Sequence, residues 1–217
     1  MQTFGSSDVL RAGIGYIHHS YLPEEINHDW LDDGNEQHKA TGTEHVHANE
    51  AYAYLDNSYY FTHWLSVEAG VRATSFAISG KTFTSLEPRA SVKTKHNDNL
   101  SLKAAYSRMT QMAQQVSNNN ITLPTDLWRP VTAQQKPVSS DQVAVGAYGN
   151  LPWHAYFSVE GWYKRMRNLL EYRDGVSVFN QNLPWTDKVV SGRGWAYGVD
   201  LTATSPPRNG QAPSQAR

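Results

Sequence analysis

The sequence has no cysteine, no long apolar run and no excess of either charge. The lack of cysteine excludes a disulfide scaffold and any site built on a thiolate. A net charge of −1 provides neither a basic surface for nucleic acid nor an acidic tail. No stretch approaches the roughly 18 apolar residues that a membrane-spanning helix requires. These absences argue against disulfide-rich domains, nucleic-acid-binding proteins and helical membrane proteins.

Aromatic residues are plentiful, whereas charged residues are scarce. The 12 Tyr and 7 Trp help to raise the aromatic content to 12%, and charged residues make up 18% of the chain, below the usual share of about a quarter. The mean hydropathy is polar, at −0.60. A membrane β-barrel is compatible with this balance, because its strands alternate in polarity and averaged scales conceal their apolar face.

Apolar and polar residues alternate with a period of two in several segments. Over residues 65–74, Leu, Val and Ala occupy the odd positions, and polar residues or Gly the even ones. Residues 100–107 and 157–164 follow similar patterns. Alternation of this kind predicts an all-β, antiparallel structure whose strands have one apolar and one polar face. About eight meandering strands are predicted, near residues 9–20, 46–57, 64–77, 86–96, 100–110, 139–150, 155–172 and 188–203.

The predicted connections differ in length from one end of the strands to the other. Short ones fall at residues 57–63, 96–99 and 150–154, and long ones at 21–45, 111–137 and 174–187; residues 79–85 are a brief exception. Transmembrane barrels have short periplasmic turns and longer extracellular loops. Several strands also exceed the usual length of about five or six residues in soluble proteins. Both features favour a segment of a transmembrane β-barrel.

The composition changes at Ser205. Residues 205–217, SPPRNGQAPSQAR, contain three prolines and no aromatic or β-branched residue. We therefore divide the chain into a partial barrel over residues 1–204 and a tail over residues 205–217. By composition the tail is disordered, and the alternative is that its sequence is not native to the protein.

Six segments resemble strands and loops of TonB-dependent receptors of the Bacteroidetes type. They are LEPRASV (86–92), SLKAAYSRMTQ (101–111), LPTDLWRPVT (123–132), KPVSSDQVAVGAYG (136–149), FSVEGWYKRMRNLLEYRDG (157–175) and GRGWAYGVDL (192–201). The resemblance covers roughly residues 8–203, and its strength lies in the order of the six segments. It identifies the chain as part of the barrel of such a receptor.

The resemblance implies a barrel of about 22 strands with a plug in its lumen, in the outer membrane of a Gram-negative bacterium. It implies uptake of a scarce nutrient such as a siderophore, vitamin, glycan or peptide. The expected partners are outer-membrane lipid and lipopolysaccharide, the small nutrient ligand, and the TonB complex acting through a plug that this sequence lacks. We predict no cofactor, no enzymatic activity and no nucleic-acid partner. The segment by itself is not expected to transport.

The predicted loop over residues 111–137 contains the candidate ligand residues. Asn119, Asp126, Trp128 and Arg129 combine amide, charged and aromatic side chains, which suit the capture of a sugar, peptide or chelate. The alternative interpretation is that apolar residues of this loop, Trp128 among them, only pack it against a neighbouring element. The sequence leaves both interpretations open.

Nine histidines raise the possibility of a metal site, notably at His18, His19, His45 and His47. Residues two apart on a strand place their imidazoles on one side, so that His45 and His47 could ligate a metal. They share parity with apolar residues of the same strand, however, and we favour a polar rim above the membrane. We predict no metal site, and no set of residues stands out for catalysis.

The alternation assigns side chains to two faces. Val67, Leu102, Val145 and Val159 are predicted to face lipid, and Glu68, Lys103 and Glu160 to face the lumen. Charges of both signs on the polar face are tolerated in contact with water and partner charges, but are costly in lipid. Their role is either contact with the plug or a solvated wall of ion pairs, and we favour the solvated wall.

Four arginines are predicted to form a basic collar on the lipid side. Arg108, Arg165, Arg167 and Arg193 each lie beyond a Tyr or Trp, towards the outside, in the lipid-facing row of a strand. Because such aromatic residues mark the membrane interface, the guanidinium groups could bind phosphates of lipopolysaccharide. The alternative is that they snorkel or form a rim clear of the membrane.

Two other classes of protein remain as alternatives. The Trp and Tyr content would also suit a soluble, carbohydrate-binding β-sandwich, whose strands should be shorter and whose loops should not be sorted by end. An outer-membrane barrel enzyme would need a catalytic set, such as Asp/His or Ser/His, at the outer rim of a smaller closed barrel.

Overall fold

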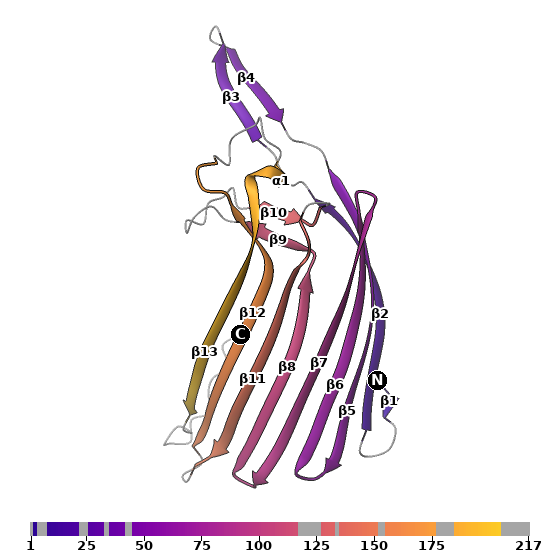
Figure 1. The fold of residues 1–217 in the computed structure, drawn as a ribbon, viewed down its shortest axis with the longest axis vertical. Helices are drawn as coiled ribbons and strands as arrows, with labels where there is room; N and C mark the ends of the chain where they lie inside the picture. Colours follow the sequence, from indigo (N-terminus) through magenta and orange to yellow (C-terminus); the bar gives the residue numbers. More distant parts are fainter. Residues whose placement is uncertain are drawn as a thin grey trace.

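Most of the chain forms one large antiparallel sheet (Figure 1). The computed structural model describes residues 2–3, 8–21, 26–32, 35–41, 45–116, 127–132, 135–151, 155–176 and 185–204. The strands of the sheet are, in spatial order, β1 (Gln2–Thr3), β2 (Asp8–Tyr21), β5 (Val46–Thr62), β6 (Leu65–Ile78), β7 (Lys81–Asn97), β8 (Leu100–Gln111), β11 (Val138–Asn150), β12 (Tyr156–Tyr172) and β13 (Val189–Thr204). Apart from the short β1, these are eight long strands in a meander, which confirms the predicted fold class.

Smaller elements interrupt the meander at one end. The hairpin β3 (Ile26–Asp32) and β4 (Asn35–Thr41) follows β2, and the hairpin β9 (Ala113–Val116) and β10 (Leu127–Pro130) follows β8. A single helical turn, α1 (Trp185–Lys188), precedes β13. None of these was predicted from the sequence. Within the described residues, no helix is long and apolar enough to cross a membrane.

Two predicted connections are shorter than expected. β5 continues to Thr62, because Asn57 and Tyr60 pair with Ala69 and Ser66 of β6 and so satisfy their backbone groups in the ladder. The predicted connection over residues 79–85 is reduced to a turn at Ser79 and Gly80, both with positive φ, and β7 begins directly after it. Glycine accepts that conformation at no steric cost, which allows the tight reversal.

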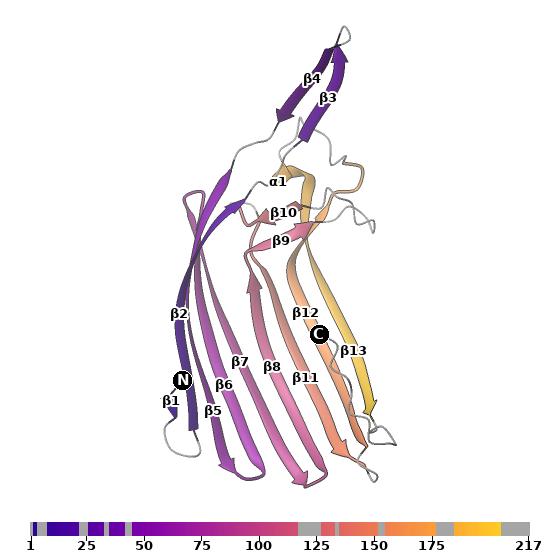
Figure 2. The same cartoon turned by 180° about the vertical axis from the view of Figure 1, so that it is seen from behind.

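The connections are sorted by length, as predicted. The turns β5–β6, β7–β8 and β11–β12 lie together at the lower end of Figures 1 and 2. The connections that follow β2, β8 and β12 lie at the upper end, together with the brief turn between β6 and β7. We call these the turn end and the loop end. The tail over residues 205–217 lies outside the described residues.

The pairing register gives the sheet two chemically distinct faces. Residues paired across neighbouring antiparallel strands point to the same face, so that a row can be followed across the sheet. One row reads Val67, Val92, Ala104, Val145, Gly161 and Val199. The adjacent row reads Glu68, Ser91, Ala105, Ala144, Trp162 and Gly198. We call the first the outer face and the second the inner face.

The outer face leaves large apolar side chains uncovered. Val145 is 63% exposed and Leu201 74% exposed, and their neighbours on β11 to β13 in the same rows are Val, Ala and Gly. The sheet is curved rather than flat. In Figures 1 and 2 the strands near the β2 edge overlap, whereas β8, β11, β12 and β13 lie side by side. The register confirms that Val67, Leu102, Val145 and Val159 share one face and that Glu68, Lys103 and Glu160 share the other.

Candidate functional site

The β9–β10 hairpin is anchored to the inner face at the loop end. Met112 precedes β9 and Val131 follows β10, and their backbones are joined by a hydrogen bond of 2.9 Å from Val131 N to Met112 O. Both side chains are buried in a cluster with Ala48, Phe76 and Ile78 of β5 and β6. Phe76 has no exposed surface. This cluster fixes the base of the hairpin over the inner wall.

The far end of the hairpin packs on β12, α1 and β13. Val116, the last residue of β9, is buried with Tyr172, Trp185 and Val189. The Arg129 guanidinium lies 5.3 Å from the centre of the Trp185 ring, within reach of a cation–π interaction. Gln135 adds a hydrogen bond of 2.9 Å from its side-chain amide to the carbonyl of Thr186. The hairpin therefore connects the β5–β6 side of the sheet with its β12–β13 side.

The structure separates the candidate ligand residues. Trp128 is 55% exposed, whereas its neighbour Arg129 is only 3% exposed, because successive residues of β10 point to opposite sides. Arg129 thus supports the hairpin from beneath, and Trp128 is accessible at the loop end. Asn119 and Asp126 lie outside the described residues. The prediction that these residues bind a ligand stays a prediction.

Sequence reasoning missed the residues that position the hairpin. Met112 and Val131 both lie inside the predicted loop over residues 111–137, which contains other apolar residues such as Val116, Ile121 and Leu123. Nothing in the sequence therefore distinguishes these two as the residues that hold the loop against the protein. The partners of these two residues, on β5 and β6, lie far away in sequence and could not be identified from it.

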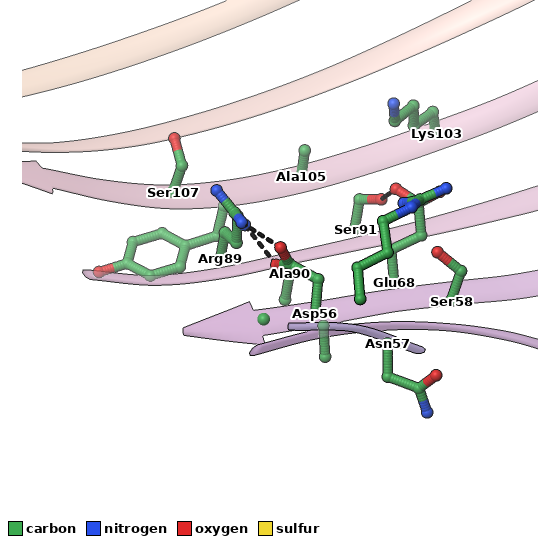
Figure 3. Close-up of a pocket in the computed structure, with 14 residues that line it drawn as sticks. Asp56, Asn57, Ser58, Glu68, Arg89, Ala90, Ser91, Lys103, Ala105 and Ser107 are labelled. Carbon is green, nitrogen blue, oxygen red and sulfur yellow. Dashed lines mark hydrogen bonds and ion pairs between the residues drawn. The ribbon is translucent and has the colours of Figure 1, made fainter. Parts of the chain in front are cut away.

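The inner wall holds a polar hollow of about 370 Å³ (Figure 3). Arg89 of β7 reaches across β6 to Asp56 of β5, and its Nε donates to Oδ1 at 2.6 Å while Nη2 contacts the second carboxylate oxygen. Gly70 lies between them, paired in register with both. A Cβ at residue 70 would overlap the Asp56 carboxylate. The glycine is therefore what lets the ion pair span three strands.

Further polar contacts line the same wall. Ser91 donates to Glu68 at 3.2 Å, within the hollow. Closer to the loop end, Glu50 accepts from Arg72 at 3.2 Å, and the Arg72 guanidinium lies 4.0 Å from the centre of the Tyr52 ring. The Glu50–Arg72 and Asp56–Arg89 ion pairs thus give the inner wall paired charges. That this wall is solvated and does not contact a plug stays a prediction.

The histidines considered as metal ligands, His18, His19, His45 and His47, do not all lie on one face of the sheet. His19 lies on the inner face, 3.0 Å from Glu50, whereas His18 lies on the outer face, 2.9 Å from Asn49. His47 stacks on His18 and on His45, with ring centroids 5.5 and 6.3 Å apart. Within the part of the chain that the structure describes, no group of three or more His, Cys, Asp or Glu residues is arranged to hold a metal ion.

The four collar arginines lie close together on the outer face. Asp141 of β11 pairs in register with Arg108 of β8 on one side and with Arg165 of β12 on the other. Arg167 and Arg193 pair with each other two residues further towards the loop end. The structure therefore brings together side chains from four strands that are far apart in sequence.

The comparisons with known proteins agree with this architecture. Residues 3–211 match the family described as TonB dependent receptor-like, beta-barrel. The fold is similar to the FrpB iron transporter from Neisseria meningitidis, with 11% identity, a TM-score of 0.60, and coverage of 94% of this chain and 31% of that one. It is also similar to the ferric-catecholate import receptor Fiu from E. coli K12, with 9% identity, a TM-score of 0.56, and coverage of 91% and 32%.

A third similar structure is the FpvAI–pyocin S2 complex, with 15% identity, a TM-score of 0.57, and coverage of 94% and 28%. This chain thus spans about a third of the length of the structures that it resembles. No curated protein matches the sequence. The family match covers nearly the whole chain and coincides with the meander of long strands, its sorted connections and its two distinct faces. The chain therefore belongs to the family of TonB-dependent receptor-like β-barrels.

Proposed function

We propose that this chain forms part of the wall and mouth of an outer-membrane receptor of a Gram-negative bacterium, of the Bacteroidetes type. The receptor takes up a scarce nutrient, such as a siderophore, vitamin, glycan or peptide, and works as a transporter rather than an enzyme. The observation that carries this proposal is the apolar outer face opposite a wall of paired charges. Such a face is stable next to lipid, while the paired charges are stable next to water.

The height of the apolar band supports the proposal. Along the outer face of β12, Phe157 marks the turn end and Arg165 follows eight residues later, with Val159, Gly161 and Tyr163 between them. Eight residues span about 26 Å along a strand, or about 20 Å along the membrane normal at a tilt of about 40°. That height approaches the apolar band of about 25 Å of outer-membrane barrels.

Two surfaces have distinct roles in this proposal. The inner wall faces the lumen, where water between the wall and a plug domain keeps its ion pairs solvated. The TonB complex acts through that plug domain. The loop end faces the outside, and the β9–β10 hairpin presents Trp128 there for contact with the nutrient. Asn119 and Asp126, which lie between β9 and β10 in the sequence, are the other candidate ligand residues. The buried Arg129 holds the hairpin in place against Trp185.

The test uses the full-length receptor that contains this chain. It should sediment with the outer membrane, shift in gel migration on heating, and support uptake of one nutrient from a panel of ferric siderophores, cobalamin, glycans and peptides. That uptake should disappear when tonB is deleted. Uptake that does not depend on TonB would contradict the proposal, as would recovery of the receptor in the soluble fraction. Hydrolysis of a panel compound by the purified receptor would favour the enzyme alternative.

A further inference from the structure

The outer face of the eight long strands gathers all its Lys and Arg side chains in one place. In the register of the described strands, every other Lys and Arg of β2, β5–β8 and β11–β13 falls on the inner face. The four exceptions are Arg108, Arg165, Arg167 and Arg193, which we call the arginine cluster. A charge on the lipid-facing side is costly unless it lies at the membrane interface. Four arginines gathered at one place on this side therefore indicate a specific role.

One carboxylate lies among the four guanidinium groups. Asp141 is 3.9 Å from Arg108 and 3.7 Å from Arg167, and it accepts a hydrogen bond of 2.9 Å from the hydroxyl of Tyr106. Arg165 and Arg193 form no ion pair with any residue that the structure describes. The Arg167 Nε is buried and has no hydrogen-bond partner among the described residues. The cluster therefore retains positive charge and donor capacity for an external anion.

Aromatic residues lie directly on the turn-end side of the cluster. The next row on the outer face contains Tyr106, Val143, Tyr163 and Tyr197. Trp195 pairs with Arg165, and its ring stacks on that of Tyr197 with centroids 5.7 Å apart. Tyr and Trp concentrate where a membrane meets water. The arginine cluster thus lies at the level of lipid headgroups on the loop-end side, which is the outer leaflet in the proposed orientation.

An apolar hollow lies on β7, β8, β11 and β12, on the turn-end side of the aromatic row. Its volume is about 480 Å³, and its lining includes Val92, Leu102, Ala104, Val145, Val159 and Gly161. The hollow exists because the residues at its centre are small: no atom lies within 4 Å of where a Cβ on Gly161 would be placed. Cationic groups above an apolar hollow match a lipid whose headgroup is anionic and whose acyl chain hangs below it.

We infer that β7, β8, β11, β12 and β13 form a binding site for one lipopolysaccharide molecule. The arginine cluster binds the phosphates of its lipid A headgroup, and the hollow takes one of its acyl chains. Guanidinium groups suit this task because they donate two parallel hydrogen bonds to a phosphate. The inference rests on the proposed function, since only a barrel in the outer membrane meets this lipid.

The test compares three variants of the full-length receptor with the native protein. Arg165→Gln/Arg193→Gln removes two cations that form no ion pair with any described residue, so that it leaves the Asp141 contacts in place. Gly161→Leu places an apolar side chain in the hollow, at a position where an added Cβ has no atom within 4 Å. Lys164→Gln is the matched control, because it removes a cation from the inner face of the same strand. Outer-membrane location and heat-dependent gel migration are checked first for every variant.

Diphosphorylated lipid A that co-purifies with each receptor is then counted by mass spectrometry. The arginine double variant should lose about tenfold or more, since a charge-assisted hydrogen bond corresponds to about that factor. Gly161→Leu should also lose lipid, and Lys164→Gln should match the native receptor. Added diphosphorylated lipid A should raise the melting temperature of the native receptor, whereas dephosphorylated lipid A and inorganic phosphate should not.

Equal lipid A in the double variant and the native receptor would overturn the inference. So would an equal loss in Lys164→Gln, or stabilisation by inorganic phosphate alone, which would indicate a free anion and not a lipid. If the native receptor is found in the outer membrane and one of these results is obtained, the lipid site fails while the proposed function stands. If the native receptor were absent from the outer membrane, the proposed function itself would fail, and the lipid site with it.

Discussion

Replacing Val145 with arginine would place a guanidinium group in the middle of the outer face. Val145 pairs with Ala104 on one side and Gly161 on the other, and neither neighbour can supply a counter-charge. Gly161 lies midway along β12 between Phe157, near the turn end, and Arg165 in the arginine cluster. Val145 is therefore close to the middle of the apolar band, where a charge is furthest from water on both sides.

The expected cost follows from this depth. An arginine at the midplane of an outer-membrane barrel costs about 2–4 kcal/mol on the lipid face. Ala144 is the matched control, because it lies next to Val145 on the same strand but points to the inner face, between Ala105 and Trp162. An arginine there reaches the water of the lumen and the face of the Trp162 ring. Its cost should be below about 1 kcal/mol.

The free energy of unfolding is measured by denaturant titration of the full-length receptor in phospholipid vesicles. Val145→Arg should lower this free energy by about 2–4 kcal/mol, and Ala144→Arg should leave it almost unchanged. Labelling of a cysteine at each position with a lipid-soluble reagent provides a second readout, in which only residue 145 should react strongly. Equal destabilisation by the two arginines, or equal labelling of the two cysteines, would refute the assignment of the faces.

Three further predictions concern the full-length receptor and the isolated segment. Gly70→Ala should displace the Asp56 carboxylate from Arg89. The expected cost is about 1 kcal/mol of unfolding free energy, because the Arg89 side chain is half exposed and water weakens the ion pair. Gly161→Ala should cost less, because a methyl group there meets no atom. Phe76→Ala should cost about 3–5 kcal/mol through the cavity beneath the β9–β10 hairpin, and limited proteolysis should then cut the hairpin faster than in the native receptor. Residues 1–204 expressed alone should aggregate in buffer without detergent, because the apolar face and the two sheet edges lack their partners; a monodisperse, cooperatively melting monomer would argue against the membrane assignment.

The strands and their faces were predictable because they depend on local alternation. A side chain at residue 67 or 145 points away from those of its chain neighbours whatever the rest of the fold does. Its face then follows from parity alone, as for Val67 and Glu68. The same reasoning placed Arg108, Arg165, Arg167 and Arg193 on one face. Their proximity to one another and to Asp141 depends on register, which the sequence pattern does not specify.

The errors at strand ends have a different cause. Asn57 and Ser58 are poor indicators of a strand by composition and interrupt the pattern, whereas the four residues that follow favour a strand. Pairing with β6 carries β5 through the interruption to Thr62. The β9–β10 hairpin was not predicted because its stability comes from contacts with Phe76 and Trp185, which are distant in sequence. Gly70 likewise gave no signal in the sequence, because its role depends on Asp56 and Arg89, which belong to two other strands.

The exposed side chains of the outer face argue against a soluble sandwich. In a sandwich, a second sheet covers the apolar face of the first, and the side chains of the two facing surfaces interdigitate. Here Val199 and Leu201 of β13 are both largely exposed, and the described residues include no second sheet that covers them. The polar inner face, in contrast, is lined by ion pairs and receives the β9–β10 hairpin. The sheet therefore has an uncovered apolar face and a charged face that bears the hairpin. Such a sheet is stable when lipid covers the apolar face and water lies beside the charged face. Its edges are satisfied when further strands of the family's barrel pair with β1 and β13.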